Sequence, residues 1–122
     1  VTFQGRISID KIPGEIRASD VGLVPNISNA FTEINFPQRI LEFSLLRKPL
    51  IVARLGGIED YVTEKDVLFF TPCISPELSD KILECSSEPD QTQSRVDHAY
   101  QTCKLLEWEK PYLNIVNSIL GL

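Results

Sequence analysis

Short apolar runs alternate with longer segments of helical period along the first seventy residues. Three runs are predicted to be buried strands, because each is continuous, apolar and bounded by loop residues; they lie at 21–25, 50–53 and 67–70. A fourth run, at 1–3, could be the remnant of another strand. Helical segments are predicted at 11–19, 37–47 and 58–62. This order is typical of βαβ units, and it predicts an α/β fold with a parallel sheet covered by helices.

After residue 72 the pattern is helical only. Ser75 and Pro76 are an N-cap and first-turn pair for a helix that reaches about Ser86, and Pro89 enforces a break after it. Apolar stripes predict two more helices, the first with Val96, Ala99, Tyr100, Cys103 and Leu106, the second with Leu113, Val116, Ile119 and Leu120. We therefore expect one domain of 122 residues, with a βα core at 1–72 and C-terminal helices at 73–122.

Composition and charge exclude several classes of function. The net charge of −5, with Lys and Arg scattered singly, argues against a nucleic-acid partner. The three cysteines, Cys73, Cys85 and Cys103, lack the spacing of a zinc or redox motif, so we expect free thiols in a reducing compartment and no metal or other cofactor. No run is long and apolar enough to span a bilayer, no signal peptide is seen, and a cytoplasmic location is expected. The start at Val1, without Met, indicates a fragment.

The segment 31–43 carries the clearest chemical signal. It runs from a predicted loop into a helix and has an acid near each end, Glu33 and Glu42. The amino terminus of a helix has unpaired N–H groups and a partial positive charge, so this turn could receive a diphosphate, with Arg39 as a supplement. Glu42 could accept two hydrogen bonds from a vicinal diol such as a ribose. The alternative is that Glu42 is a solvated surface residue whose partner is Arg39, at i, i+3.

Five stretches, taken in order, resemble one known family. They are Gly5 and the tracts 18–25, 36–43, 48–51 and 57–61, and they look like the group 1 glycosyltransferases, also called family 4. The similarity extends from Val1 to about Trp108. It implies a Rossmann-like parallel sheet flanked by helices, which is part of the C-terminal, donor-binding domain of a GT-B fold, with a helical C-terminal tail. Several spaced matches in one order are more specific than a single motif.

The resemblance also implies a function. It is transfer of a sugar from a UDP- or GDP-sugar to an acceptor hydroxyl, with retention at the anomeric carbon, commonly in polysaccharide or glycolipid biosynthesis. The family's ribose-binding glutamate corresponds to Glu42. The family's other glutamate, which touches the donor sugar, falls on Ile34, so the preceding residue, Glu33, is the catalytic candidate. The predicted substrate-binding set is completed by Arg39, Asn35, Phe36, Ile40 and Leu41.

The family's phosphate-binding Arg and Lys and its N-terminal domain have no counterpart in the chain. We therefore expect the chain to be inactive in sugar transfer when alone, with that N-terminal domain as its partner. Membrane association, at the inner face, would come through the absent half. Two alternatives stay open: a noncatalytic interaction or regulatory module with a degenerate donor site, and an epimerase of the same architecture, which the tract 36–43 fits less well than a transferase.

Three further positions carry structural expectations. Arg47 stands where most relatives have Gly, in a place where a helix often ends with a left-handed residue, and keeping that conformation would cost about 1 kcal/mol. Gly56 and Gly57 could let the backbone approach a nucleotide, but glycines in such a turn are more often a structural requirement. His98, the only histidine, has no ligand set or nucleophile near it in sequence, and a structural role is expected.

Overall fold

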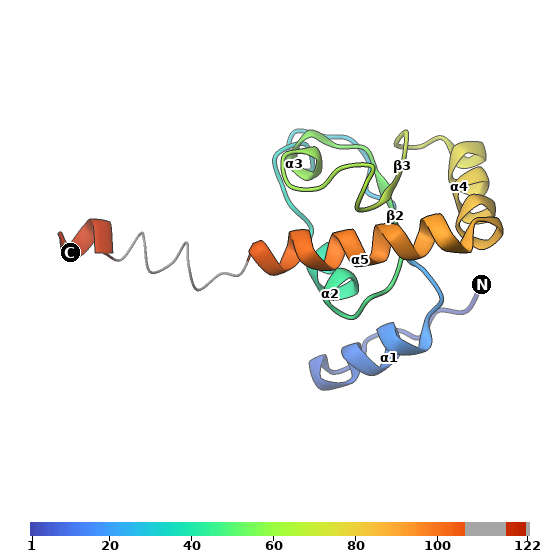
Figure 1. Ribbon diagram of the computed structural model, residues 1–122, viewed down its shortest axis with the longest axis horizontal. Coiled ribbons are helices and arrows are strands. Elements are labelled where there is room, and N and C mark those ends of the chain that lie inside the picture. Colours follow the sequence, from blue (N-terminus) through green and yellow to red (C-terminus); the bar gives the residue numbers. More distant parts are fainter. Residues whose placement is uncertain (107–116, 122) are drawn as a thin grey trace.

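Helices and strands alternate along the first seventy residues of the chain, whose computed structural model describes residues 1–106 and 117–121 (Figure 1). The elements in order are the 3-10 helix η1 (Ile9–Lys11), α1 (Ile12–Ala18), β1 (Gly22–Val24), α2 (Gln38–Leu45), β2 (Leu50–Ala53), α3 (Gly56–Glu59), β3 (Leu68–Phe70), α4 (Ser75–Ser87) and α5 (Pro89–Leu105). A helical turn follows at 117–120. The three predicted strands and the alternation of elements are confirmed.

The strands form one parallel sheet in the order β1-β2-β3. Leu23 pairs with Ile51, and Ile51 with Leu68 on the other side, so β2 is the central strand. Every side chain of β2 is buried, which is typical of a parallel strand with both faces covered. The helices α2 and α4 pack against the sheet, and α5 runs across the molecule beside α2 (Figure 1). The predicted α/β fold with a parallel sheet flanked by helices is confirmed.

Residues 1–3 are not a strand, so that prediction is wrong. Val1 and Phe3 are exposed, and none of the described strands pairs with this segment. An apolar run becomes a strand only where a neighbour accepts its backbone hydrogen bonds. The free edge of β1 has no such neighbour among the described residues.

The carboxyl end of α2 has a Schellman arrangement. The Lys48 N–H donates to the Phe43 carbonyl at 3.0 Å, and the Arg47 N–H donates to the Ser44 carbonyl at 3.1 Å. Arg47 has a φ of 55°, so the left-handed conformation that is common at this place is kept despite the change from Gly, and the helix ends at Leu45 rather than at Arg47. Because Arg has a Cβ, this backbone conformation costs about 1 kcal/mol relative to glycine.

The C-terminal helices follow the predicted pattern with small shifts. The N-cap of α4 is Ile74, and Ser75 is its first helical residue rather than its cap. The helix α5 begins directly at Pro89, and Val96, Ala99 and Cys103 of its predicted stripe are buried. Three residues of the expected terminal segment, Trp108, Leu113 and Val116, lie outside the described residues. Among the described helices, none combines the length and the apolar character that crossing a membrane requires.

Candidate functional site

A pocket of about 400 Å³ lies between the carboxyl end of β1 and the first turns of α2. Its walls come from three elements, and its lining residues are Ile12, Val24, Pro25, Asn26, Pro37, Gln38, Arg39 and Glu42. Ligands of open parallel sheets bind at the carboxyl ends of the strands, which is where this pocket lies. The N-cap of α2 is Pro37, and no side chain caps this helix end. The Ile40 N–H donates to the Pro37 carbonyl at 3.0 Å, and the N–H groups of Gln38 and Arg39 remain suited to an anion.

Two of the predicted site residues, Arg39 and Glu42, meet at this pocket. Glu42 is partly buried and Arg39 is exposed. Within the described ranges, 1–106 and 117–121, neither side chain forms a hydrogen bond or an ion pair, so the alternative of an Arg39–Glu42 surface pair is not found. A guanidinium and a carboxylate are thus placed on one cavity beside a helix amino terminus. This set can hold a phosphate and a diol at the same time.

The other predicted binding residues do not line the pocket. The Ile40 side chain is wholly buried in the core, where it has a packing role and does not line the pocket. It faces inward because α2 must bury one stripe against the sheet. Phe36 packs against the core with its ring 5.0 Å from that of Tyr61. Asn35 and Leu41 are partly buried outside the lining, so the side chains brought together are those of Arg39 and Glu42.

Glu33, the predicted catalytic acid, is bound to the start of α3. One carboxylate oxygen accepts a hydrogen bond from the Ser28 hydroxyl, and the other accepts the Gly56 N–H at 3.0 Å. Its backbone carbonyl also accepts the Gly57 N–H, at 2.7 Å. The Ser28 hydroxyl first, and then the Gly56 N–H, hold the pKa of Glu33 below its usual value. Glu33 therefore caps α3 as a carboxylate and does not line the pocket.

Gly57 explains why this loop lies so close to α3. A Cβ at Gly57 would lie 2.8 Å from the Asn35 nitrogen and 2.8 Å from the Ile34 carbonyl carbon. Backbone atoms that near cannot move aside without displacing the whole loop. The sequence left two alternatives for this glycine pair, approach to a nucleotide or a structural requirement, and the structural requirement is found at Gly57. The residue Ile34 in the same loop is 81% exposed.

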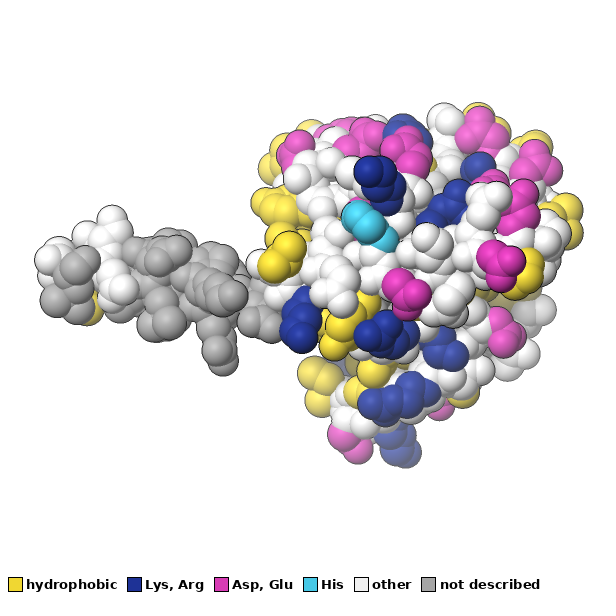
Figure 2. Space-filling view, in the orientation of Figure 1, with side chains coloured by type: hydrophobic (Ala, Val, Ile, Leu, Met, Phe, Trp, Pro, Cys, Tyr) yellow, Lys and Arg dark blue, Asp and Glu magenta, His cyan; other side chains and the backbone are white. Residues whose placement is uncertain are grey.

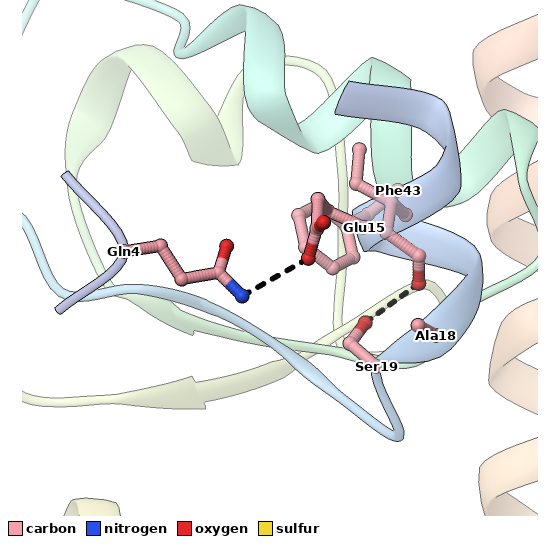
Figure 3. A pocket seen from close by; sticks show the side chains of 6 residues that line it. Gln4, Glu15, Ala18, Ser19 and Phe43 are labelled. Atoms are coloured by element: carbon pink, nitrogen blue, oxygen red, sulfur yellow. Dashed lines mark hydrogen bonds between the residues drawn. The ribbon is translucent and has the colours of Figure 1, made fainter. Parts of the chain in front are cut away.

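A second cavity, of about 420 Å³, lies between α1 and Phe43 (Figure 3). Its polar side chains are already satisfied by the protein. The Gln4 amide donates to Glu15 at 3.1 Å, and the Ser19 hydroxyl donates to the Ile16 carbonyl at 2.7 Å, as the dashed lines in Figure 3 show. This cavity is of similar size to the α2 pocket, but its acid, Glu15, is engaged and none of the described residues that line it is a Lys or Arg. It is the weaker candidate for a charged ligand.

His98 takes part in a network around Asp66, a residue that no sequence pattern had indicated. The Asp66 carboxylate accepts hydrogen bonds from the Thr102 hydroxyl at 2.7 Å and the Thr63 N–H at 2.8 Å, and it lies 2.7 Å from the His98 Nδ1. Burial by itself raises the pKa of Asp66, but the hydrogen bonds from Thr102, Thr63 and His98 together lower it. This network ties α5 to the turn before β3, in agreement with a structural role for His98.

Charge is unevenly distributed over the surface despite the net value of −5. On the face seen in Figure 2, most Asp and Glu side chains lie over the upper part, where α3 and α4 lie, whereas Lys and Arg side chains lie over both the upper and the lower part. Among the described residues, no group of three or more His, Cys, Asp or Glu is arranged to hold a metal ion.

Comparison with known proteins gives matches of structure only. No protein-family model matches the chain, and no curated protein does. The structure of HepE from Anabaena in complex with UDP and glucose matches all of the chain with a TM-score of 0.86 and 22% identity, over 32% of the HepE chain. The HepE complex with UDP-glucose matches 91% of the chain, with a TM-score of 0.80, 22% identity and 30% coverage of HepE. Sucrose-phosphate synthase from Thermosynechococcus elongatus matches 99% of the chain, with a TM-score of 0.84, 20% identity and 30% coverage of the synthase.

The chain has the fold of part of a GT-B glycosyltransferase. This confirms the expected fold class, and at 20% to 22% identity the likeness concerns the fold. The chain spans about a third of the length of the structures that it matches. In this GT-B portion, the residues that sequence reasoning missed at the α2 pocket are chiefly Val24, Pro25 and Asn26. Their place at the end of a predicted parallel strand was the available signal.

Proposed function

We propose that the chain is the donor-binding part of a glycosyltransferase that uses a nucleotide diphosphate sugar, UDP- or GDP-linked. The observation that carries the proposal is that Arg39 and Glu42 both line one pocket, at the amino terminus of α2. The fold shared with HepE, whose structures hold UDP and UDP-glucose, supports it. The resemblance to the group 1, or family 4, glycosyltransferases points in the same direction.

In this proposal each group at the pocket has one task. The N–H groups of the first turn of α2 and the Arg39 guanidinium bind the diphosphate, whose charge increases as the sugar leaves. The Glu42 carboxylate accepts hydrogen bonds from the ribose hydroxyls and so orients the nucleotide. The sugar is transferred to an acceptor hydroxyl with retention, in polysaccharide or glycolipid assembly at the cytoplasmic side. The acceptor site and the remaining catalytic groups belong to the N-terminal domain, so residues 1–122 alone are inactive.

In this proposal Glu33 has a structural role in place of the predicted catalytic one. Its hydrogen bonds to Ser28 and Gly56 hold the loop 26–36 beside α3, and Asn26 of this loop lines the pocket. These two bonds occupy one acceptor site on each carboxylate oxygen and point the Glu33 side chain to α3 rather than into the α2 pocket. We therefore propose that Glu33 maintains the conformation of the loop. Whether it also contacts the donor sugar is a question for experiments on the donor-bound protein.

A second candidate function is a noncatalytic interaction or regulatory module with a degenerate donor site. The observation in its favour is the position of the family's sugar-contacting glutamate, which is Ile34 here, while the neighbouring acid Glu33 is engaged by α3. This candidate predicts no dependence on a nucleotide, even when the chain is joined to its N-terminal domain.

A titration of the chain with UDP and GDP at millimolar concentration separates the two functions. Calorimetry or ligand-observed NMR is run on the wild type, on Glu42→Ala and on Asp80→Ala, which removes an exposed acid of α4 as a control for charge. The donor-domain proposal expects base-selective binding by the wild type and Asp80→Ala, weakened at least tenfold in Glu42→Ala. Absence of binding both by the chain and by the chain joined to its N-terminal domain contradicts it and supports the noncatalytic module.

A further inference from the structure

Arg47, in the turn that ends α2, has a backbone conformation that is unusual for a residue other than glycine. Arg47 has a φ of 55° in the Schellman turn, a region that favours glycine because a Cβ is crowded there. Arg47 keeps this conformation while its side chain extends to another helix. Glycine would give the same turn without this strain. The contacts of the Arg47 side chain are therefore what could compensate for it.

That contact is made with α5. The Arg47 guanidinium carbon lies 3.9 Å from the centre of the Tyr100 ring, and the Nη1 atom lies 3.2 Å from the Asp97 Oδ1. The same Asp97 oxygen accepts a hydrogen bond from the Gln93 amide at 3.1 Å, which fixes its position. Tyr100 and Asp97 are three residues apart and so share one face of α5. Together these contacts form a clamp, defined here as Arg47 with Asp97 and Tyr100.

The clamp and the nucleotide pocket share one short helix. Arg47 follows Glu42 by five residues, which corresponds to about 7.5 Å along a helix axis. With only eight residues, α2 has two turns in which Ile40 and Ser44 are the buried side chains. A helix so short is held by tertiary packing, here against the sheet and α5, and Arg47 adds contacts to α5 at its carboxyl end. A change at Arg47 would therefore reach Glu42 through the helix itself.

We propose that Arg47 is a positioning residue for nucleotide binding, acting through α2 on Glu42 and Arg39. The inference rests on the proposed function and adds to it that α5 takes part in the donor site without touching the ligand. When the clamp is closed, α2 holds Glu42 facing the pocket. When the clamp is removed, α2 samples other orientations about its axis. The apparent affinity then falls with the fraction of molecules in the binding-competent orientation.

The substitution Arg47→Gly separates this role from general stabilisation. It removes the clamp, but it also removes the backbone strain at φ 55°, so the two effects on stability oppose each other. A residue that only stabilised the fold would lose no affinity when stability is kept. A positioning residue loses affinity although the protein stays folded. The melting temperature and the affinity must therefore be measured on the same samples.

The experiment is a UDP and GDP titration of the wild type, Arg47→Gly and Tyr100→Leu, with thermal melts of each. We expect the dissociation constant to rise about three- to tenfold in Arg47→Gly, with a melting temperature equal to or above that of the wild type. Tyr100→Leu, which breaks the clamp from the α5 side, should weaken binding to a similar degree. The double variant should be no weaker than either single one, because both remove the same interaction.

Arg54→Ala is the matched control. Arg54 also stacks on an aromatic ring, that of Phe69 at 4.5 Å, and pairs with Glu64 at 2.6 Å, but it lies outside α2 and the α2 pocket. It should lower the melting temperature and leave the dissociation constant within about twofold. Wild-type affinity in Arg47→Gly, with Glu42→Ala still impaired, overturns the clamp and leaves the donor site standing. Failure of the wild type to bind, alone and joined to its N-terminal domain, overturns the proposed function and the clamp with it.

Discussion

Glu33 and Glu42 lie on either side of the turn into α2, and the fold uses their carboxylates in opposite ways. Glu33 is bound by the Ser28 hydroxyl and the Gly56 N–H, so its charge stabilises the loop and the start of α3. Glu42 lies on the pocket between α2 and β1, and no described side chain engages it. Sequence motifs alone made both of them ligand candidates. In this structure the acid that is bound by backbone and hydroxyl donors stabilises a loop, whereas the unengaged acid on a cavity is available to a ligand.

Asp66 is a second acid whose carboxylate is hydrogen-bonded by the protein, and its removal should have the largest effect on stability. Its side chain is only 2% exposed and it accepts hydrogen bonds from Thr63 and Thr102. We expect Asp66→Ala to lower the free energy of unfolding by about 2 to 3 kcal/mol, because buried donors lose their acceptor. Urea denaturation at neutral pH measures this. An unchanged midpoint would contradict the structural use of the network.

The pH dependence of Asp66 has a definite sign. Because its pKa is lowered in the folded protein, the stabilisation is fully present above the ordinary aspartate pKa and is lost as the pH falls through the folded-state value. The stability difference between wild type and Asp66→Asn should therefore be constant near neutral pH and shrink only below the ordinary aspartate range. Denaturation curves of both proteins along a pH series measure this difference. A difference that shrinks already between pH about 7 and about 5 would contradict it.

Gly57 tests whether the loop that carries Glu33 depends on its close approach to α3. The substitution Gly57→Val places a side chain where backbone atoms of Ile34 and Asn35 lie, and we expect a loss of about 2 kcal/mol in unfolding free energy. The control is Gly14→Ala in α1, where nothing lies within 4 Å of the new Cβ. The control should gain up to about 1 kcal/mol from helix propensity. Equal thermal shifts for the two variants would show that the loop is not seated as described.

The carboxyl end of α2 provides a smaller effect. Arg47→Ala removes the clamp and keeps a Cβ at a φ of 55°, whereas Arg47→Gly removes both the clamp and the strain. We expect Arg47→Ala to be less stable than Arg47→Gly by about 1 kcal/mol, measured by chemical denaturation. The reverse order would mean that the turn leaves the left-handed conformation when the arginine is replaced.

The finest test exchanges the roles of the two glutamates. Glu33→Gln should lower the melting temperature modestly and leave the UDP dissociation constant within about twofold, because the loop loses a charged acceptor but the pocket keeps Glu42. Glu42→Gln should do the reverse, with an unchanged melting temperature and weaker binding. The effect of Glu33→Gln on stability should vanish in acid, since the lowered pKa of Glu33 means that its contribution is lost as the pH falls through the folded-state value. Loss of UDP binding in Glu33→Gln would return Glu33 to the site.

The sequence by itself determined the order of the elements and the parallel sheet, and the resemblance to relatives with Gly at position 47 marked the place where a left-handed turn could end the helix. These depend on local rules: continuous apolar runs for buried strands, proline at a first helical turn, and the geometry that ends a helix. It also selected Arg39, from its place in the first turn of a predicted helix, and Glu42, on which the family resemblance places the ribose-binding role. Residues 1–3 show the limit, since an apolar run alone cannot supply a pairing strand.

Only the tertiary structure decided which charged groups were engaged. Glu33 meets Gly56 across 23 residues, Arg47 meets Asp97 across 50, and Asp66 meets Thr102 across 36. Contacts at such separations are set by how elements pack, and a residue's own neighbours in the chain carry no record of them. For the same reason Ile40, in the middle of the predicted binding segment, belongs to the core. The segment could be chosen from the sequence, but packing decided which of its side chains faced the pocket.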